Sequence, residues 1–188
     1  MSLYLIRHGK TEANEKRLYC GRTDLPLSAA GAEELHRLAY EIPDARFLTS
    51  GMRRTDETLS ILFGEVPYDT DPRFREMDFG SFEMHSYQQL KDTPAYQRWL
   101  TGDNEANRAP GGESGVQMKQ RVLAAFSEIR EDTVLIAHGG VIAAIMAHLF
   151  PEEEKSRYGW QPDFGCGYLV RNGGYEPIPS VRNGKNTL

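Results

Sequence analysis

The chain has 188 residues, of which 39% are hydrophobic, and its 22 Lys and Arg are outnumbered by 27 Asp and Glu, giving a formal net charge of −5 at pH 7. This balance excludes a broad nucleic-acid-binding face, which would need an excess of positive side chains. Attraction to an anionic substrate must therefore come from a local cluster of positive groups.

The N-terminal third of the sequence alternates predicted strands and helices. Ser2–Ile6 is short, apolar and closely followed by a glycine, as in a buried strand. A helix is predicted between its N-cap Ser28 and Pro43, because its apolar side chains fall on one face. These side chains are Leu35, Leu38, Ala39 and Ile42. A second strand, Ala45–Thr49, leads into a helix with Ser50 as its N-cap.

The middle section, residues 66–113, is rich in proline and is predicted to be irregular, with short helices at 87–90 and 96–100. Ser114 and Gln117 form a capping-box pattern that opens a longer helix. The later elements are expected to be this helix to Ile129, a buried strand Thr133–Ala137, an apolar helix from Gly139 to about Phe150, and strands Phe164–Val170 and Tyr175–Ile178. Strands that alternate with helices indicate an α/β fold, a three-layer α/β/α sandwich with a mostly parallel sheet.

The whole length, residues 1–188, fits one domain with a substantial core. Cys20 and Cys166 are too few for a disulfide framework and have no CxxC spacing, which favours a reducing cytoplasmic compartment. The short apolar run that ends at Arg7 is expected to be neither a signal peptide nor a membrane span. We therefore expect a cytoplasmic protein that binds neither nucleic acid nor a membrane.

Three predicted strands end beside unusual polar residues. These are Arg7-His8-Gly9 after the first strand, Ser50 and Arg53-Arg54 after the second, and His138-Gly139-Gly140 after the third. The carboxyl ends of parallel strands meet at one edge of a sheet, where loops lead into helix N-termini, so we expect these groups to lie close together. Two histidines and two or three arginines at such an edge form a strong anion site.

Two other kinds of site are less consistent with these residues. Gly9-Lys10-Thr11 matches the end of a nucleotide-binding P-loop, but Tyr4 occupies the position of the first glycine that such a loop needs. His8, His138 and a carboxylate could bind a metal, but neighbouring arginines would repel a cation and no HExxH motif adds further ligands. We therefore expect neither a P-loop nucleotide site nor a metal site.

Five blocks follow one another along the chain in a distinctive order. They are Arg7-His8-Gly9-x-Thr11-x-x-Asn14, Gly21…Asp24-x-Pro26-Leu27-Ser28…Gly31, Ser50-x-x-x-Arg54-x-x-x-Thr58, Arg75-Glu76-Met77-Asp78-Phe79-Gly80-x-Phe82-Glu83 and His138-Gly139-Gly140. Together they resemble the histidine phosphatase superfamily, the phosphoglycerate-mutase-like group, although Gly51-Met52 and Thr55 depart from its usual second block. The resemblance implies the phosphoglycerate-mutase-like α/β/α fold.

The resemblance also implies a mechanism. His8 would be the nucleophile that forms a phosphohistidine, and it must be neutral, with its other ring N–H bound to a backbone carbonyl. Arg7, Arg54 and His138 would bind the phosphoryl oxygens, so that neither a metal nor another cofactor is needed. Glu76 would protonate the leaving oxygen and then activate water. The substrate-binding residues would be Asn14, Cys20, Gly21 and Gly139.

The sequence leaves some site assignments open. Helical periodicity does not decide whether Arg53 or Arg54 faces the phosphate, although the motif register selects Arg54. Asp78 and Glu83 are alternatives to Glu76 as the acid, but they are better explained as residues that turn the loop and hold it in place. Nearby arginines are expected to lower the pKa of the Glu76 carboxyl, and an incoming phosphate dianion is expected to raise it again.

The sequence also does not decide which phosphate ester is the substrate. The stretches LYCGRTDLPLS, FGSFEM and PGGES resemble the α-ribazole phosphatase branch, and they also fit broad-specificity phosphatases. The expected partner is a small phosphate ester, with α-ribazole 5′-phosphate as one candidate. The alternatives are mutase-type phosphoryl transfer and a catalytically silent module that only binds phosphate. Tyr87, Tyr96 and Trp99 could stack on a substrate ring or belong to the core.

Overall fold

The described residues fold around one mixed β-sheet of six strands in the order β3-β2-β4-β1-β5-β6. The structure, a computed structural model, describes residues 1–41, 43–103 and 105–179. The strands are β1 (Leu3–Arg7), β2 (Arg46–Thr49), β3 (Asp69–Thr70), β4 (Thr133–Ala137), β5 (Gly167–Arg171) and β6 (Gly174–Ile178). The first four strands run parallel, whereas β5 pairs antiparallel with β1 and β6 pairs antiparallel with β5. The predicted α/β fold with a mostly parallel sheet is thus confirmed.

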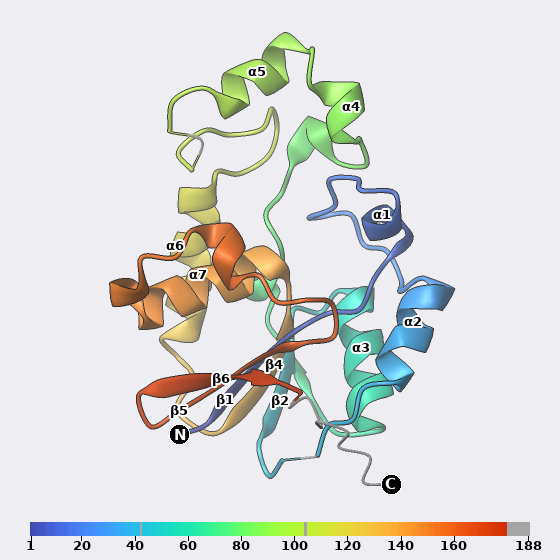
Figure 1. Ribbon diagram of the computed structural model, residues 1–188, viewed down its shortest axis with the longest axis vertical. Helices are drawn as coiled ribbons and strands as arrows, with labels where there is room; N and C mark the ends of the chain where they lie inside the picture. Colours follow the sequence, from blue (N-terminus) through green and yellow to red (C-terminus); the bar gives the residue numbers. More distant parts are fainter. Residues whose placement is uncertain (42, 104, 180–188) are drawn as a thin grey trace, which may run out of the picture.

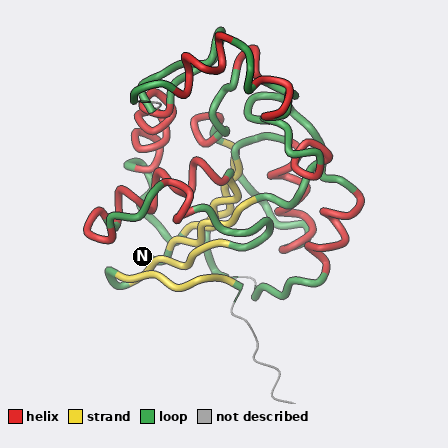
Figure 2. Tube along the Cα trace, turned by 45° about the horizontal axis from the view of Figure 1, so that its top comes forward, coloured by secondary structure: helices red, strands yellow, loops and turns green. Residues whose placement is uncertain are grey.

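Helices cover both faces of this sheet (Figure 1 and Figure 2). They are α1 (Glu12–Glu15), α2 (Ala29–His36), α3 (Arg53–Phe63), α4 (Tyr87–Leu90), α5 (Pro94–Leu100), α6 (Gly115–Phe126) and α7 (Gly139–Leu149), with 3-10 turns η1 (Pro72–Phe74), η2 (Gly80–Phe82), η3 (Pro151–Glu153) and η4 (Arg157–Trp160). Helices α2 and α3 lie on one side and α6 and α7 on the other. None of the helices in the described ranges is long and apolar enough to cross a bilayer.

Strand β4 is the centre of the core. It lies between β1 and β2, and all five of its residues are buried. Because side chains alternate across a strand, Leu135 belongs to the apolar cluster under α6 and α7, whereas Val134 and Ile136 belong to the cluster under α3. An uninterrupted apolar run is what a strand buried on both faces requires, which is why its bounds could be predicted.

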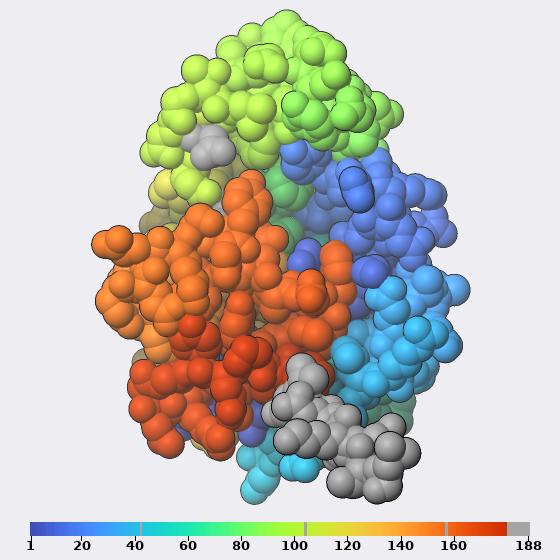
Figure 3. Space-filling model, viewed as in Figure 1, coloured from blue at the N-terminus to red at the C-terminus, as the bar shows by residue number. Residues whose placement is uncertain are grey.

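Residues 81–103 and 105–109, called the cap here, stand beyond the carboxyl ends of the parallel strands and carry α4 and α5 (Figure 1, green). The cap has its own apolar cluster, made of Phe82, Leu90, Tyr96 and Ala109 with Tyr19, Phe79 and Trp99 packed against them. Tyr96 is 2% exposed and Trp99 contacts its ring, so both belong to this cluster. Tyr87 is 51% exposed. In Figure 3 a hollow opens below the cap, between the blue N-terminal segment and the orange segment after α7.

The cap joins the rest of the molecule through two adjacent segments, 78–80 and 110–113, called the neck here. Ser81 donates from its backbone N–H to the Pro110 carbonyl at 2.8 Å. A Cβ on Gly80 would lie only 2.3 Å from the same oxygen, and the backbone there has φ +51°, so glycine is required on both counts. The two ends of the cap are therefore held against each other.

Helix α2 ends earlier than predicted. Ser28 is its N-cap, as expected, and accepts from a backbone N–H at 3.0 Å, but the last helical residue is His36. The chain turns away there because the Tyr40 hydroxyl donates to the Gly165 carbonyl at 2.7 Å, a contact that a continued helix would not make. The predicted helical residues beyond its end are Leu38, Ala39 and Ile42, the last of which lies outside the described residues.

Other boundaries also differ from the prediction. Ser50 does not cap α3, which begins at Arg53 after Met52. Helix α6 ends at Phe126 rather than Ile129, although the capping box of Ser114 and Gln117 is present as predicted. Strand β5 begins at Gly167, three residues after the predicted Phe164, and the two-residue strand β3 was too short to be recognised.

Candidate active site

The carboxyl ends of β1, β2 and β4 meet at one edge of the sheet. Arg7 pairs in register with Ala137, and the backbone N–H of His8 donates to the Ala137 carbonyl at 3.0 Å. His138 follows Ala137, and its ring centroid lies 5.0 Å from that of His8. The structure therefore brings together two histidines that the sequence placed at separate strand ends.

His8 is held in one tautomer by its own backbone. Its side chain is 5% exposed, and Nδ1 lies 2.6 Å from the Gly9 carbonyl oxygen. Because a carbonyl only accepts, Nδ1 carries the proton, and Nε2 keeps its lone pair. Burial and the nearby charge of Arg54 lower the pKa of His8 well below its usual value. The ring is therefore neutral, as a nucleophile must be.

Arg54 is the arginine of α3 that faces this edge. It is 1% exposed, and it donates from Nη1 to the Thr23 carbonyl at 2.9 Å and from Nη2 to the Gly21 carbonyl at 2.7 Å. The side chain of Arg53, by contrast, is 60% exposed and pairs with Glu57. Arg54, and not Arg53, is therefore the arginine that lies at this edge of the sheet.

His138 has both ring nitrogens bonded within the protein. Arg54 donates from Nε to Nδ1 at 3.3 Å, so in the neutral ring Nε2 carries the proton and donates to the Ser50 hydroxyl at 2.9 Å. Ser50 also contacts the Thr55 hydroxyl at 3.1 Å, which explains why it does not cap α3. Burial and the charge of Arg54 lower the pKa of His138 well below its usual value. As a neutral ring it keeps no N–H for a ligand.

Arg7 has a buried donor without a partner. Its guanidinium lies 3.8 Å from the centroid of the Phe164 ring, and Nη1 donates to the Pro162 carbonyl at 2.8 Å. Among the described residues, Nε makes no hydrogen bond although it is buried. Gly139 leaves the space beside it open, since a Cβ there would approach the Arg7 Cζ to 3.2 Å. A buried N–H in this state requires an acceptor, which a bound oxyanion would supply.

Glu76 reaches the same site from the segment before the cap. Its Oε2 accepts from the Gly140 N–H at 2.9 Å in the first turn of α7, and its Oε1 accepts from the Met77 N–H at 2.9 Å. Burial lowers the pKa of both Arg7 and Arg54, and the negative charge of Glu76 opposes that shift. The carboxylate thus lies within electrostatic reach of both guanidinium groups.

The two other carboxylates considered as the acid have structural partners. Asp78 accepts from the Gly80 N–H at 2.8 Å and pairs with Arg22 at 3.0 Å, so it turns the loop as predicted. Glu83 binds a set of backbone donors that joins two loops. These donors are the N–H groups of Gly21, Arg22, Thr23 and Phe79 and the hydroxyl of Thr23. The Gly21 and Thr23 carbonyls bound by Arg54 are therefore fixed through Glu83.

The remaining candidates for substrate binding shape the surrounding loops. Asn14 uses Oδ1 to accept from the Thr11 N–H at 3.0 Å and so completes the capping box of α1, whose N-cap is Thr11. Burial raises the pKa of the Cys20 thiol, which is consistent with its role as a donor to a backbone carbonyl at 3.6 Å. Gly21 has no room for a side chain, because a Cβ would lie 1.6 Å from the Met77 carbonyl oxygen. Direct contact of these residues with a substrate stays a prediction.

The sequence placed Ser50 and Gly140 at the same strand ends but did not predict what either contacts. The role of Gly140 could have been predicted, because the first N–H groups of a helix have no partner within it and attract negative groups. That of Ser50 could not, because its partner His138 lies 88 residues away in the chain.

The arrangement suits a dianionic ligand. Two guanidinium groups, the N-terminus of α7 and a neutral imidazole with a free Nε2 lie together, beside a carboxylate able to exchange a proton. In the part of the chain that the structure describes, no group of three or more His, Cys, Asp and Glu side chains could hold a metal ion. Arg7 and Arg54 supply positive charge at this site.

Comparisons with known proteins agree with this arrangement. The model of the histidine phosphatase superfamily (branch 1) matches residues 3–173. The adenosylcobalamin/alpha-ribazole phosphatase of Salmonella typhimurium is 32% identical over 180 residues, covering 88% of each chain. A probable phosphoglycerate mutase GpmB of Yersinia enterocolitica is 27% identical and covers 93% of each chain. The crystal structure of a putative alpha-ribazole-5'-P phosphatase of Escherichia coli superposes with a TM-score of 0.78 at 28% identity, covering 94% of each chain.

Proposed function

This chain belongs to the histidine phosphatase superfamily, and on that basis we propose that it is a metal-independent phosphomonoesterase that hydrolyses a small phosphorylated metabolite through a phosphohistidine on His8. The observation that carries this proposal is the state of the His8 ring. Its Nδ1 is committed to the Gly9 carbonyl and its lowered pKa keeps Nε2 unprotonated beside Arg54. Such a ring is an activated nucleophile facing a cationic group.

The reaction has two steps. In the first, the Nε2 lone pair of His8 attacks phosphorus, the P–O bond to the alcohol breaks, and the leaving oxygen takes a proton from Glu76. In the second, the Glu76 carboxylate takes a proton from water as the water oxygen attacks phosphorus. The N–P bond then breaks, its electron pair returns to His8, and inorganic phosphate leaves.

Arg7 and Arg54 stabilise the charge on the phosphoryl oxygens. Arg7 can donate to a phosphoryl oxygen from its unpaired Nε. Arg54 can donate from the N–H groups that are not used in its contacts with His138, Thr23 and Gly21. His138 serves first to orient Arg54. A direct contact of His138 with the phosphoryl group requires either that its Nε2–H leave the Ser50 hydroxyl or that Nδ1 gain a proton, and the negative charge of a bound dianion favours the added proton.

The substrate class is inferred from the relatives. Those named adenosylcobalamin/alpha-ribazole phosphatase support α-ribazole 5′-phosphate as a candidate. The relatives named probable phosphoglycerate mutase support a second candidate, transfer of the phosphoryl group from His8 to another alcohol instead of to water. Both reactions share the first step and differ in the acceptor.

A trapping experiment and a substrate panel test this proposal. Rapid acid-free quenching with a radiolabelled phosphate ester should leave label on the wild-type chain, and His8→Asn should leave none and lower turnover by more than about 10³-fold. His36→Asn, in the exposed part of α2, is the matched control. Release of inorganic phosphate from α-ribazole 5′-phosphate, 3-phosphoglycerate and 4-nitrophenyl phosphate separates hydrolysis from transfer. Neither label nor turnover with any ester would instead indicate a silent phosphate-binding module.

A further inference from the structure

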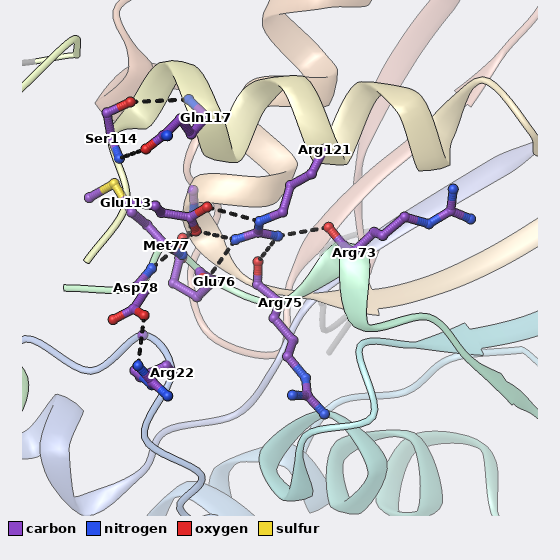
Figure 4. Close-up of polar contacts among 12 residues, drawn as sticks. Arg22, Arg73, Arg75, Glu76, Met77, Asp78, Glu113, Ser114, Gln117 and Arg121 are labelled. Carbon is purple, nitrogen blue, oxygen red and sulfur yellow. Dashed lines mark hydrogen bonds and ion pairs between the residues drawn. The ribbon is translucent and has the colours of Figure 1, made fainter. Parts of the chain in front are cut away.

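Arg121 on α6 is bonded to the segment that carries Glu76. Its Nη1 donates to the carbonyl oxygens of Arg73 and Arg75, both at 2.7 Å, and its Nη2 donates to the carbonyl oxygen of Glu76 at 3.0 Å. Figure 4 shows the guanidinium reaching from the helix between these carbonyls and Glu113. One side chain therefore fixes three backbone positions immediately before and at Glu76.

Glu113 completes this arrangement from the neck. Its carboxylate pairs with Arg121 through both oxygens, with one contact at 3.1 Å to Nε and a second to Nη2. The same carboxylate accepts from the Asp78 N–H at 3.1 Å, and the Glu113 N–H donates to the Asp78 carbonyl at 3.0 Å. Arg121 and Glu113, called the positioning pair here, thus bond the chain on both sides of Glu76.

We propose that the positioning pair sets the place of the Glu76 carboxyl group and thereby controls its efficiency as the proton donor to the leaving oxygen. This inference rests on the proposed phosphomonoesterase function. The segment between η1 and η2 is irregular, so no helix or strand fixes residues 75–79. The Glu76 carboxylate is anchored by two N–H groups, but its backbone position depends on Arg121.

The positioning pair can affect the reaction rate because proton transfer depends on the exact position of the Glu76 carboxyl group. Proton transfer requires hydrogen-bond distance to the leaving oxygen, and a misplacement of about 1 Å can lower a rate by about 10²-fold. Arginine is needed because its planar fork bonds a carboxylate bidentately while further N–H groups remain for carbonyls, which lysine cannot reproduce. The hydrogen bonds of Arg121 and Glu113 go to each other and to the backbone of the segment around Glu76, so both are positioning residues.

The dependence on the leaving group separates this role from a purely structural one. An alkyl phosphate needs its leaving oxygen protonated, whereas 4-nitrophenolate leaves readily without a proton. In Arg121→Met we expect kcat for an alkyl phosphate to fall by about 10- to 100-fold with little change in KM, and kcat for 4-nitrophenyl phosphate to fall less than about threefold. Arg121→Lys should lie between Arg121→Met and the wild type.

Glu113→Gln is the second variant, because it keeps the side-chain shape if Arg121→Met fails to fold. It should show the same preference for the nitrophenyl ester at a smaller magnitude. Glu128→Gln is its matched control: it breaks an ion pair of 2.6 Å with Arg73 but contacts neither Glu76 nor Asp78. Arg46→Met, which removes an exposed pair with Asp69, is the control for Arg121→Met. Both controls should leave the ratio of the two kcat values unchanged.

A double variant gives an independent check. In a Glu76→Gln background the proton donor is already gone, so adding Arg121→Met should change alkyl ester turnover less than about threefold. Equal losses with both esters, or a full additional loss in the Glu76→Gln background, would overturn the positioning role while leaving the phosphatase function intact. A wild-type chain that hydrolyses no ester at all would overturn the proposed function, and the positioning role with it.

Discussion

Arg54 donates from Nε to Nδ1 of His138 across 3.3 Å, and the two side chains are 1% and 0% exposed. This bond joins the helix that follows β2 to the strand end of β4. It uses the ring nitrogen of His138 that would otherwise be free for a ligand, because Nε2 is bonded to Ser50. The buried polar groups at this edge of the sheet are therefore assembled around Arg54.

Replacing Arg54 should abolish most of the activity. Arg54→Lys keeps the charge but loses the planar fork that bonds Thr23, Gly21 and His138 at once. We expect kcat/KM to fall by about 10²- to 10³-fold, the usual effect of losing one donor to a transition-state oxyanion. Arg53→Lys is the matched neighbour on the same helix, and a comparable loss there would contradict the assignment.

The two buried histidines should make stability depend on pH. The pKa of His8 and of His138 is lowered in the folded chain, whereas in the unfolded chain histidine titrates near about 6.5. Below about pH 6.5 the unfolded chain therefore binds protons that the folded chain does not, and the free energy of unfolding decreases as pH falls. Each histidine contributes up to about 1.4 kcal/mol per pH unit in this window.

Urea unfolding between about pH 7.5 and 5 measures this slope. His8→Asn should make the slope shallower, because one of the two groups no longer titrates, whereas His36→Asn should retain the wild-type slope. A free energy of unfolding that stays constant over this range in the wild type would show that the histidines are not held neutral.

Replacing Glu83 should lower both the free energy of unfolding and the rate of turnover. Glu83→Gln leaves one oxygen and an NH2 group facing the N–H groups of Gly21, Thr23 and Phe79. Unpaired donors of this kind cost about 1–3 kcal/mol, so the free energy of unfolding should fall by that amount. Turnover should also decrease, since the same loop supplies the carbonyls that orient Arg54. Glu33→Gln, which removes an exposed helical pair with Arg37, should change neither quantity.

Gly21→Ala tests how tightly that loop packs against the segment that carries Glu76 and Met77. The added Cβ would lie 1.6 Å from the Met77 carbonyl oxygen, so the two backbones must move apart. Overpacking of this type costs about 1–3 kcal/mol, and we expect a matching loss in the free energy of unfolding together with reduced turnover. Gly159→Ala, where the nearest atom would be 3.5 Å away, is the control. Equal stability of the two variants would contradict the packing described.

Local patterns predicted the parts of the site that depend on strands. The apolar runs before His8 and His138 identified two parallel strands, and the rule that their carboxyl ends meet was enough to bring the histidines together. The same reasoning failed for Ser50, because a serine before a helix is a good cap unless a distant partner competes for its hydroxyl. Propensity cannot reveal such a partner.

The contacts of Arg121 also could not be predicted from the sequence. On a helix this arginine looks like an ordinary charged surface residue, and its three backbone acceptors lie 45 to 48 residues earlier in the chain. The early end of α2 has a similar cause, since Tyr40 bonds a carbonyl 125 residues away. In each case the missing information is tertiary, and it overrides a correct local preference.

The neck has a consequence for how this protein can change over evolutionary time. The two ends of the cap are bonded to each other, so the chain after Glu83 and before Ala109 can be lengthened, shortened or exchanged without altering the distance between those ends. His8, Glu76, Glu83, Arg7 and Arg54 all lie outside that stretch. The cap, which stands beyond the carboxyl ends of the parallel strands, can therefore diverge in one contiguous stretch of the gene while these five residues are inherited unchanged.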